Sequence, residues 1–197
     1  MKIAIAQINT TIGDFDGNAD KIVDAWRRAD EAGAALVVLP ELALCGYPPR
    51  DLLAKPAFLR QNQEALESLT KRSGKAVAVV GYASANETDS GRPAQNSAAV
   101  LQDGQVAAVR HKTLLPNYDV FDEDRYFEPA TGNTPVEILG TKVGITICED
   151  IWNDEVFLHD RHYDRRPAEE LTGAGAELLL NLSASPWSLG KEHSRHV

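Results

Sequence analysis

Short apolar runs alternate along the chain with longer segments in which apolar residues recur at helical spacing. This spacing, with Gly and Pro at the segment ends, predicts helices at residues 18–32, 56–73 and 167–172. Apolar and β-branched runs bounded by turn residues predict strands at residues 2–8, 35–39, 76–82, 96–101, 105–111, 136–139, 142–147 and 178–183. Helices and strands therefore alternate through most of the chain.

The order of these elements predicts an α/β fold built in layers. Asp103-Gly104 lies between two predicted strands and is a strong signal for a tight hairpin, so the fold should contain antiparallel neighbours. Alternation of strands and helices elsewhere is typical of sheets covered by helices. We therefore expect an α/β layered domain with an antiparallel contribution.

Composition narrows the class of protein. With 197 residues, 43% hydrophobic and 25% charged, the chain has the make-up of one globular domain at residues 1–197. Its formal net charge of −9 argues against nucleic acid or an anionic membrane surface as a partner, and favours a small molecule or another protein. No apolar run is long enough to span a bilayer, and the amino terminus leads into a strand rather than a signal peptide. The sequence thus predicts a cytoplasmic protein.

Three residues with reactive side chains each follow a predicted strand: Glu41 after 35–39, Lys112 after 105–111 and Cys148 after 142–147. Ligands of open α/β sheets bind beyond the carboxyl ends of the strands, so these side chains are placed to converge. A base that takes the thiol proton and a cation that favours the thiolate would activate a nucleophilic cysteine. Taken singly, each residue has a plainer interpretation: a small core cysteine, a solvated carboxylate and a surface lysine.

The histidines do not indicate a metal site. His111, His159, His162, His193 and His196 lack the compact spacing of zinc ligands, and we expect no metal. The mixed-charge segment at residues 160–167 is interpreted as an exposed loop. Cys45 and Cys148 are expected to be free thiols in a reducing compartment.

The segments around the three reactive residues carry a family resemblance. They read PELALCGYPPRDLL at residues 40–53, HKTLLPNYDVFDEDRYF at residues 111–127 and ICEDIWN at residues 147–153. Together with NLSASPWSLGK at residues 181–191, they resemble the nitrilase superfamily of carbon-nitrogen hydrolases. More narrowly, they resemble the amino-terminal glutaminase domains of bacterial glutamine-dependent NAD synthetases.

The resemblance implies a nitrilase-type α-β-β-α sandwich. Domains of that superfamily continue past the position of Val197, so the chain is expected to be truncated within its glutaminase domain. It carries no Gly-rich phosphate loop, so the ATP-dependent synthetase domain is expected to be missing. We expect no cofactor for the glutaminase step, with ATP and magnesium needed only by the missing domain. The 197 residues alone should be a weak or inactive glutaminase.

The resemblance also implies roles for individual residues. Cys148 would attack the side-chain amide of glutamine, Glu41 would transfer the protons, and Lys112 would stabilise the oxyanion. The substrate-binding residues that it implies are Tyr118, Glu149, Ser185 and Lys191. Glu123 is either a second carboxylate beside Lys112, as in some nitrilase-type sites, or a salt-bridge partner of Arg125 or another basic residue.

Partners and alternatives follow from the same motifs. The expected partners are L-glutamine, the synthetase domain of the same polypeptide and further copies of the chain in a homo-oligomer. The ammonia would serve the amidation of deamido-NAD to NAD. Cys45 lies outside the nucleophile's motif and is interpreted as structural. The alternatives are a stand-alone amidase or nitrilase acting on another small amide, nitrile or carbamoyl compound, and a non-catalytic assembly module.

Overall fold

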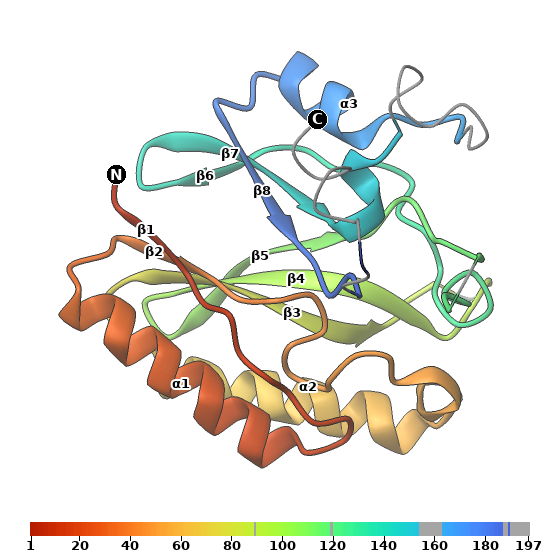
Figure 1. Cartoon of the computed structure of the whole chain (residues 1–197), viewed down its shortest axis with the longest axis horizontal. Helices are drawn as coiled ribbons and strands as arrows, with labels where there is room; N and C mark the ends of the chain where they lie inside the picture. The colour runs from red at the N-terminus through yellow and green to blue at the C-terminus, as the bar shows by residue number, and fades with distance from the viewer. Residues whose placement is uncertain (89, 119, 154–162, 187–188, 190–197) are drawn as a thin grey trace.

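The computed structural model describes residues 1–88, 90–118, 120–153, 163–186 and 189. These residues form two β-sheets that stack between helices (Figure 1). The larger sheet has the order β1 (Ile3–Ile5), β2 (Leu36–Val38), β3 (Val77–Ala85), β4 (Ala94–Gln102) and β5 (Gln105–His111). Its first three strands are parallel and the last two pairings are antiparallel. The expected antiparallel contribution is confirmed, including the hairpin at Asp103-Gly104.

The smaller sheet has three strands in the described part of the chain. Its order is β6 (Val136–Ile138), β7 (Thr141–Ile147) and β8 (Leu178–Leu182), with β6 antiparallel and β8 parallel to β7. Apolar side chains from both sheets meet between the layers, among them Val79 and Val100 from one sheet and Ile145 and Leu180 from the other. Burying these side chains holds the sheets face to face.

Helices cover the outer faces of the two sheets. Helices α1 (Phe15–Glu31) and α2 (Pro56–Thr70) lie below the larger sheet in Figure 1, and α3 (Pro167–Gly173) lies above the smaller one. The buried indole of Trp26 in α1 also donates a hydrogen bond to Ala76 O at 2.8 Å, which ties α1 to the start of β3. The layers are helix, sheet, sheet and helix, so the predicted α-β-β-α sandwich is confirmed.

The element boundaries differ from the prediction where tertiary contacts set them. The first helix begins at Phe15 rather than residue 18, because the carboxylate of Asp14 caps it by accepting a hydrogen bond from Gly17 N at 3.0 Å. Strands β3 and β4 are longer than predicted because their pairing continues to Ala85 and Ala94. Strand β1 is shorter than residues 2–8, since it pairs only with the three residues of β2.

Two short 3₁₀ helices are present in the described residues: Arg50–Ala54 follows the loop after β2, and Cys148–Ile151 directly follows β7. No helix in the described ranges has both the length and the apolar character needed to cross a bilayer. Strands β2, β3 and β5 run in the same direction, since β5 is antiparallel to β4 and β4 is antiparallel to β3. Strands β7 and β8 are parallel to each other, and Figure 1 shows that they end at the same edge of the sandwich as β2 and β5. Residues that follow these strands therefore meet at that edge.

Candidate active site

Glu41 lies just after β2, where the backbone crosses closely over β3. A side chain at Gly81 would place a Cβ 2.3 Å from Pro40 O and 2.5 Å from Leu42 N, so only glycine permits this approach. Leu42 has a φ of 50°, a left-handed conformation that is uncommon for a branched side chain. This crossing brings the Glu41 carboxylate into the interior.

Lys112 is the centre of a buried ion-pair cluster. Its Nζ donates to Glu41 Oε1 at 2.8 Å and to Glu123 Oε2 at 2.7 Å, and its side chain is 0% exposed. Burial opposes the charge of Lys112, but the negative charges of Glu41 and Glu123 outweigh it and hold the pKa of Lys112 well above its usual value. A cation is thus fixed in the interior of the site.

The Glu41 carboxylate accepts two further hydrogen bonds. Oε1 also accepts from Asn96 Nδ2 at 2.8 Å, and Oε2 accepts from the backbone N–H of Ala184 at 3.0 Å. Asn96 is a buried polar residue in β4, and neither it nor Ala184 was predicted to be part of the site. These donors, with Lys112, fix the direction of the carboxylate.

Cys148 is the first residue of the 3₁₀ helix after β7 and has a φ of 46°. Left-handed backbone at a non-glycine residue is strained and is often found at active sites. The residue is 4% exposed, and Ser183 Oγ lies 3.5 Å from its sulfur. Because Ser183 contacts the sulfur and the next residue, Ala184, binds Glu41, the thiol and the carboxylate lie on either side of one short segment. The predicted convergence of Glu41, Lys112 and Cys148 is therefore observed.

The surroundings of Cys148 favour its thiol over the thiolate. Burial is the largest cause that raises its pKa, to about 12, and the negative charge of Glu41 adds to the effect. Lys112 and the hydrogen bond from Ser183 lower it. The sulfur consequently needs a base in order to act as a nucleophile.

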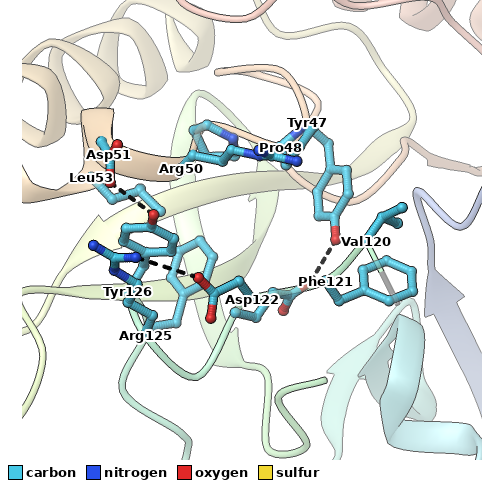
Figure 2. Close-up of a pocket in the computed structure, with 13 residues that line it drawn as sticks. Tyr47, Pro48, Arg50, Asp51, Leu53, Val120, Phe121, Asp122, Arg125 and Tyr126 are labelled. Atoms are coloured by element: carbon cyan, nitrogen blue, oxygen red, sulfur yellow. Dashed lines mark hydrogen bonds and ion pairs between the residues drawn. The ribbon is translucent and has the colours of Figure 1, made fainter. Parts of the chain in front are cut away.

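Glu123 resolves the alternative left open by the sequence: it binds Lys112, not Arg125. Its other oxygen, Oε1, accepts a hydrogen bond from the hydroxyl of Tyr47 at 2.8 Å. Arg125 instead pairs with Asp122 at 3.8 Å and lies over the ring of Tyr126. Figure 2 shows the hydrogen bond of Tyr47 and the pairing of Arg125 with Asp122 around a pocket of about 410 Å³, into which Tyr47 points from the loop after β2. The pocket reaches the cluster through Glu123, whereas Cys148 is not part of its lining.

In the wild type, ionisation of Glu123 should lower the free energy of unfolding as the pH rises from about 4.5 to about 7, and Glu123→Gln should remove this part of the pH dependence. Burial raises the pKa of Glu123 to about 7 from its ordinary 4.5. Between these values the native state keeps a proton that the unfolded state releases, so this group's contribution to stability is lost with rising pH. Denaturant unfolding across this pH range measures the slope. Glu137→Gln, at an exposed position of β6, is the control, and identical slopes in the wild type and the Glu123 variant would contradict the prediction.

A third buried carboxylate, that of Glu149, belongs to the residue that follows Cys148 in the sequence. The hydroxyl of Tyr118 lies 2.9 and 2.7 Å from its two oxygens, and the hydroxyl of Tyr163 lies 3.1 Å from Oε1. Two predicted binding residues, Tyr118 and Glu149, are thus in direct contact. Tyr163 was not predicted, and its position in the mixed-charge segment gave no signal for it.

The remaining predictions have different outcomes. Ser185 lies one residue after the segment that contacts Glu41, and its backbone N–H donates to Ser183 Oγ at 3.3 Å. Lys191 lies outside the described residues, as do four of the five histidines.

Cys45 is fully buried in an apolar cluster with Leu53 and Ala83, where burial raises its pKa to about 12, as expected for a structural cysteine. Within the described ranges, no three His, Cys, Asp or Glu residues gather as a metal site.

Comparison with known proteins gives a consistent picture. Residues 2–195 match the family described as carbon-nitrogen hydrolase. The glutamine-dependent NAD(+) synthetase of Synechocystis sp. is 45% identical over 197 residues, which cover 98% of this chain and 35% of that protein. The enzyme of the same name from Thermotoga maritima is 43% identical over 195 residues, which cover 97% of this chain and 31% of that protein. The chain thus spans about a third of the length of these relatives.

Solved structures show the same relationship. The glutamine-dependent NAD+ synthetase of Acinetobacter baumannii, in complex with adenosine diphosphate, superposes with a TM-score of 0.83 at 36% identity, over 98% of this chain and 34% of that one. A carbon-nitrogen hydrolase from Helicobacter pylori superposes with a TM-score of 0.74 at 22% identity, over 98% of this chain and 64% of that one. The second similarity concerns the fold alone.

Proposed function

Because the chain belongs to the carbon-nitrogen hydrolase family, we propose that it hydrolyses the side-chain amide of glutamine through a thioester on Cys148. The observation that carries the proposal is the buried cluster in which Lys112 Nζ lies 2.8 Å from Glu41 Oε1, with the Cys148 thiol and the Glu41 carboxylate bound to adjacent residues of one segment. An acceptor for the thiol proton, a fixed cation and a sulfur nucleophile are the groups that acyl transfer from an amide requires. The glutamine-dependent relatives support glutamine as the substrate.

The first half-reaction forms the thioester. Glu41 takes the proton of the Cys148 thiol while the sulfur attacks the amide carbon, and the carbonyl electrons move onto oxygen. Lys112 stabilises the resulting oxyanion, because its charge is already in place before the reaction begins. The C–N bond then breaks, and Glu41 returns the proton to the leaving nitrogen, which departs as ammonia.

The second half-reaction restores the thiol. Glu41 takes a proton from water, the hydroxide attacks the thioester carbon, and the C–S bond breaks to release glutamate. The proton on Glu41 returns to the sulfur. The hydrogen bonds from Asn96 and the Ala184 N–H keep the carboxylate aimed at the reacting atoms throughout both halves.

Four residues have side chains that complement the amino-acid end of glutamine. The buried Glu149 carboxylate, held by Tyr118, suits the α-ammonium group of the substrate. The hydroxyl of Ser185 and the cation of Lys191 suit the α-carboxylate. These four residues form the proposed binding set for glutamine.

The relatives are about three times as long as this chain, so they contain further sequence that could use the ammonia. In our proposal it passes to a synthetase domain of the same polypeptide, which uses ATP and magnesium to amidate deamido-NAD to NAD. A cytoplasmic location and a homo-oligomer belong to the same proposal. Hydrolysis of the glutamine amide itself needs only the side chains named above.

Comparison of two amides tests the proposal directly. Glutamine and butyramide share the same amide, but butyramide lacks the α-ammonium and α-carboxylate groups. In the natural gene product that carries this chain, kcat/KM for ammonia release should be about 10⁴-fold higher with glutamine, because a site with buried polar groups rejects a ligand that leaves them unpaired. Comparable rates with both amides would contradict the proposal and favour the stand-alone amidase.

A further inference from the structure

One more buried carboxylate, that of Asp150, lies two residues after Cys148 and has no part in the steps above. It is 2% exposed and accepts three hydrogen bonds from backbone N–H groups. Oδ1 accepts from Thr113 at 3.0 Å and from Leu114 at 2.8 Å, and Oδ2 accepts from Ile147 at 3.0 Å. Both oxygens are therefore committed to main-chain donors.

These donors are the immediate neighbours of two reacting side chains. Thr113 follows Lys112 where the chain leaves β5, and Ile147 precedes Cys148 at the end of β7. The two strands belong to different sheets, so one carboxylate joins the backbone of both layers at the edge where the site lies. On its other side, Lys112 is held by its own N–H, which donates to Asn96 O at 2.8 Å.

The local backbone explains why such a connection matters. Cys148 has a φ of 46°, and a strained conformation of this kind persists only when the surrounding contacts impose it. The hydrogen bond from Ile147 to Asp150 spans this residue and closes the turn around it. The same carboxylate also fixes residues 113 and 114, so the turn at the thiol and the backbone at the lysine share one anchor.

We infer that Asp150 is a positioning residue that sets the spacing between the Cys148 sulfur and the Lys112 ammonium by clamping the backbone beside each of them. The inference rests on the proposed function, in which these two groups act on the same carbonyl. A displacement of about 1 Å between reacting groups can lower a rate by about 10²-fold. The effect of losing the clamp therefore falls mainly on turnover.

Asp150→Asn distinguishes the hydrogen bonds that the carboxylate accepts from the space that the side chain fills. Asparagine keeps the shape of the side chain but replaces one acceptor with an N–H₂ donor. If its oxygen serves Thr113 and Leu114, its amide nitrogen faces the N–H of Ile147, and two donors then oppose each other beside Cys148. In the flipped orientation, the amide nitrogen faces the N–H groups of Thr113 and Leu114 instead.

Asp30 provides a matched control. Its carboxylate also accepts two backbone hydrogen bonds, from Lys75 N at 2.9 Å and Ala76 N at 2.7 Å, but it joins α1 to the start of β3. The Glu41 segment crosses β3 at Gly81, in the middle of that strand, and not at its start. Asp30→Asn should lower thermal stability as Asp150→Asn does, without affecting the site.

The experiment measures glutamine turnover and thiol reactivity in the natural gene product that carries this chain. We expect Asp150→Asn to lower kcat by about 10²-fold with little change in KM, and Asp30→Asn to change neither. We also expect slower alkylation of Cys148 by iodoacetamide in Asp150→Asn, followed by mass spectrometry of its peptide, because Lys112 is no longer aligned to favour the thiolate. Equal kcat and alkylation rates in the two variants would overturn the inference.

Two further measurements keep the result decisive. If Asp150→Asn does not fold, Asp150→Glu retains the charge and moves the carboxylate by one methylene, and it should show the same loss in kcat. If the wild type releases no ammonia from glutamine, the proposed function fails, yet the alkylation rates still test the clamp. If the wild type hydrolyses glutamine and Asp150→Glu has the same kcat, the proposed function is supported and the positioning role of Asp150 is refuted.

Discussion

Cys148→Ala should reduce glutamine hydrolysis to the limit of detection, a loss on the order of 10⁶-fold as for other covalent hydrolases that lose their nucleophile. Alanine cannot form the thioester, and nothing else in the described cluster offers a sulfur, since Cys45 lies in a separate apolar cluster. The fold should be kept, because the side chain is small and lies at the margin of the inter-sheet core. Ammonia release from glutamine, coupled to an enzymatic ammonia assay, measures the loss.

Cys45→Ala is the matched control for this prediction. It removes the same atom from a site with no base or cation, so glutamine turnover should be retained while stability falls slightly. In the natural gene product, use of free ammonia in place of glutamine should survive in both variants, because only attack on the amide needs the thiol. Loss of glutamine turnover in the Cys45 variant and its retention in the Cys148 variant would reverse the assignment of the nucleophile.

Lys112→Met should lower kcat by at least about 10²-fold while the affinity for glutamine changes little. Methionine has nearly the length of lysine but no charge, so the developing oxyanion loses a donor that acts mainly in the transition state. The same change leaves Glu41 and Glu123 buried without their common cation. Loss of one partner of a buried ion pair typically costs about 3–5 kcal/mol, so the melting temperature should fall as well.

Steady-state kinetics and thermal unfolding of the same preparations separate these two effects. Lys142→Met, at an exposed position of β7, is the control and should change neither quantity measurably. A Lys112 variant with unchanged kcat and a raised KM would reassign the lysine to substrate binding.

The elements of the fold were largely predictable because their signals are local. Alternating or continuous apolar runs identified the strands, and Asp103-Gly104 identified a hairpin that the structure contains. The boundaries were less accurate because they depend on contacts from elsewhere in the chain. The extension of β3 to Ala85, for example, is fixed by its partner Ala94 and not by the residues of β3.

The residues of the site also differ in whether the sequence could identify them. Glu41, Lys112 and Cys148 were identifiable because each follows a strand and lies in a recognisable motif. Asn96, Ser183 and Asp150 were missed because each role depends on a partner more than 30 residues away in sequence. The one available signal for Asn96 was the polar pair Asn96-Ser97 in the predicted strand at residues 96–101, whose other residues are apolar.

Glu123 illustrates the limit of reasoning from sequence neighbours. Arg125 is only two residues away, which made a local salt bridge a reasonable alternative. The folded chain instead turns the Glu123 carboxylate inward, where it binds Lys112 at 2.7 Å, and Arg125 pairs with Asp122. The roles of Tyr118, Glu149, Ser185 and Lys191 in substrate binding remain predictions.

Detection of the covalent intermediate tests the central claim most directly. Acid quenching of the natural gene product during turnover of glutamine, followed by proteolysis and mass spectrometry, should reveal a γ-glutamyl group on the peptide that contains Cys148. The adduct should be absent from the Cys148→Ala variant and unaffected in Cys45→Ala. Turnover of glutamine at the wild-type rate with no adduct on Cys148 at any quench time, or with the adduct on Cys45, would contradict the account.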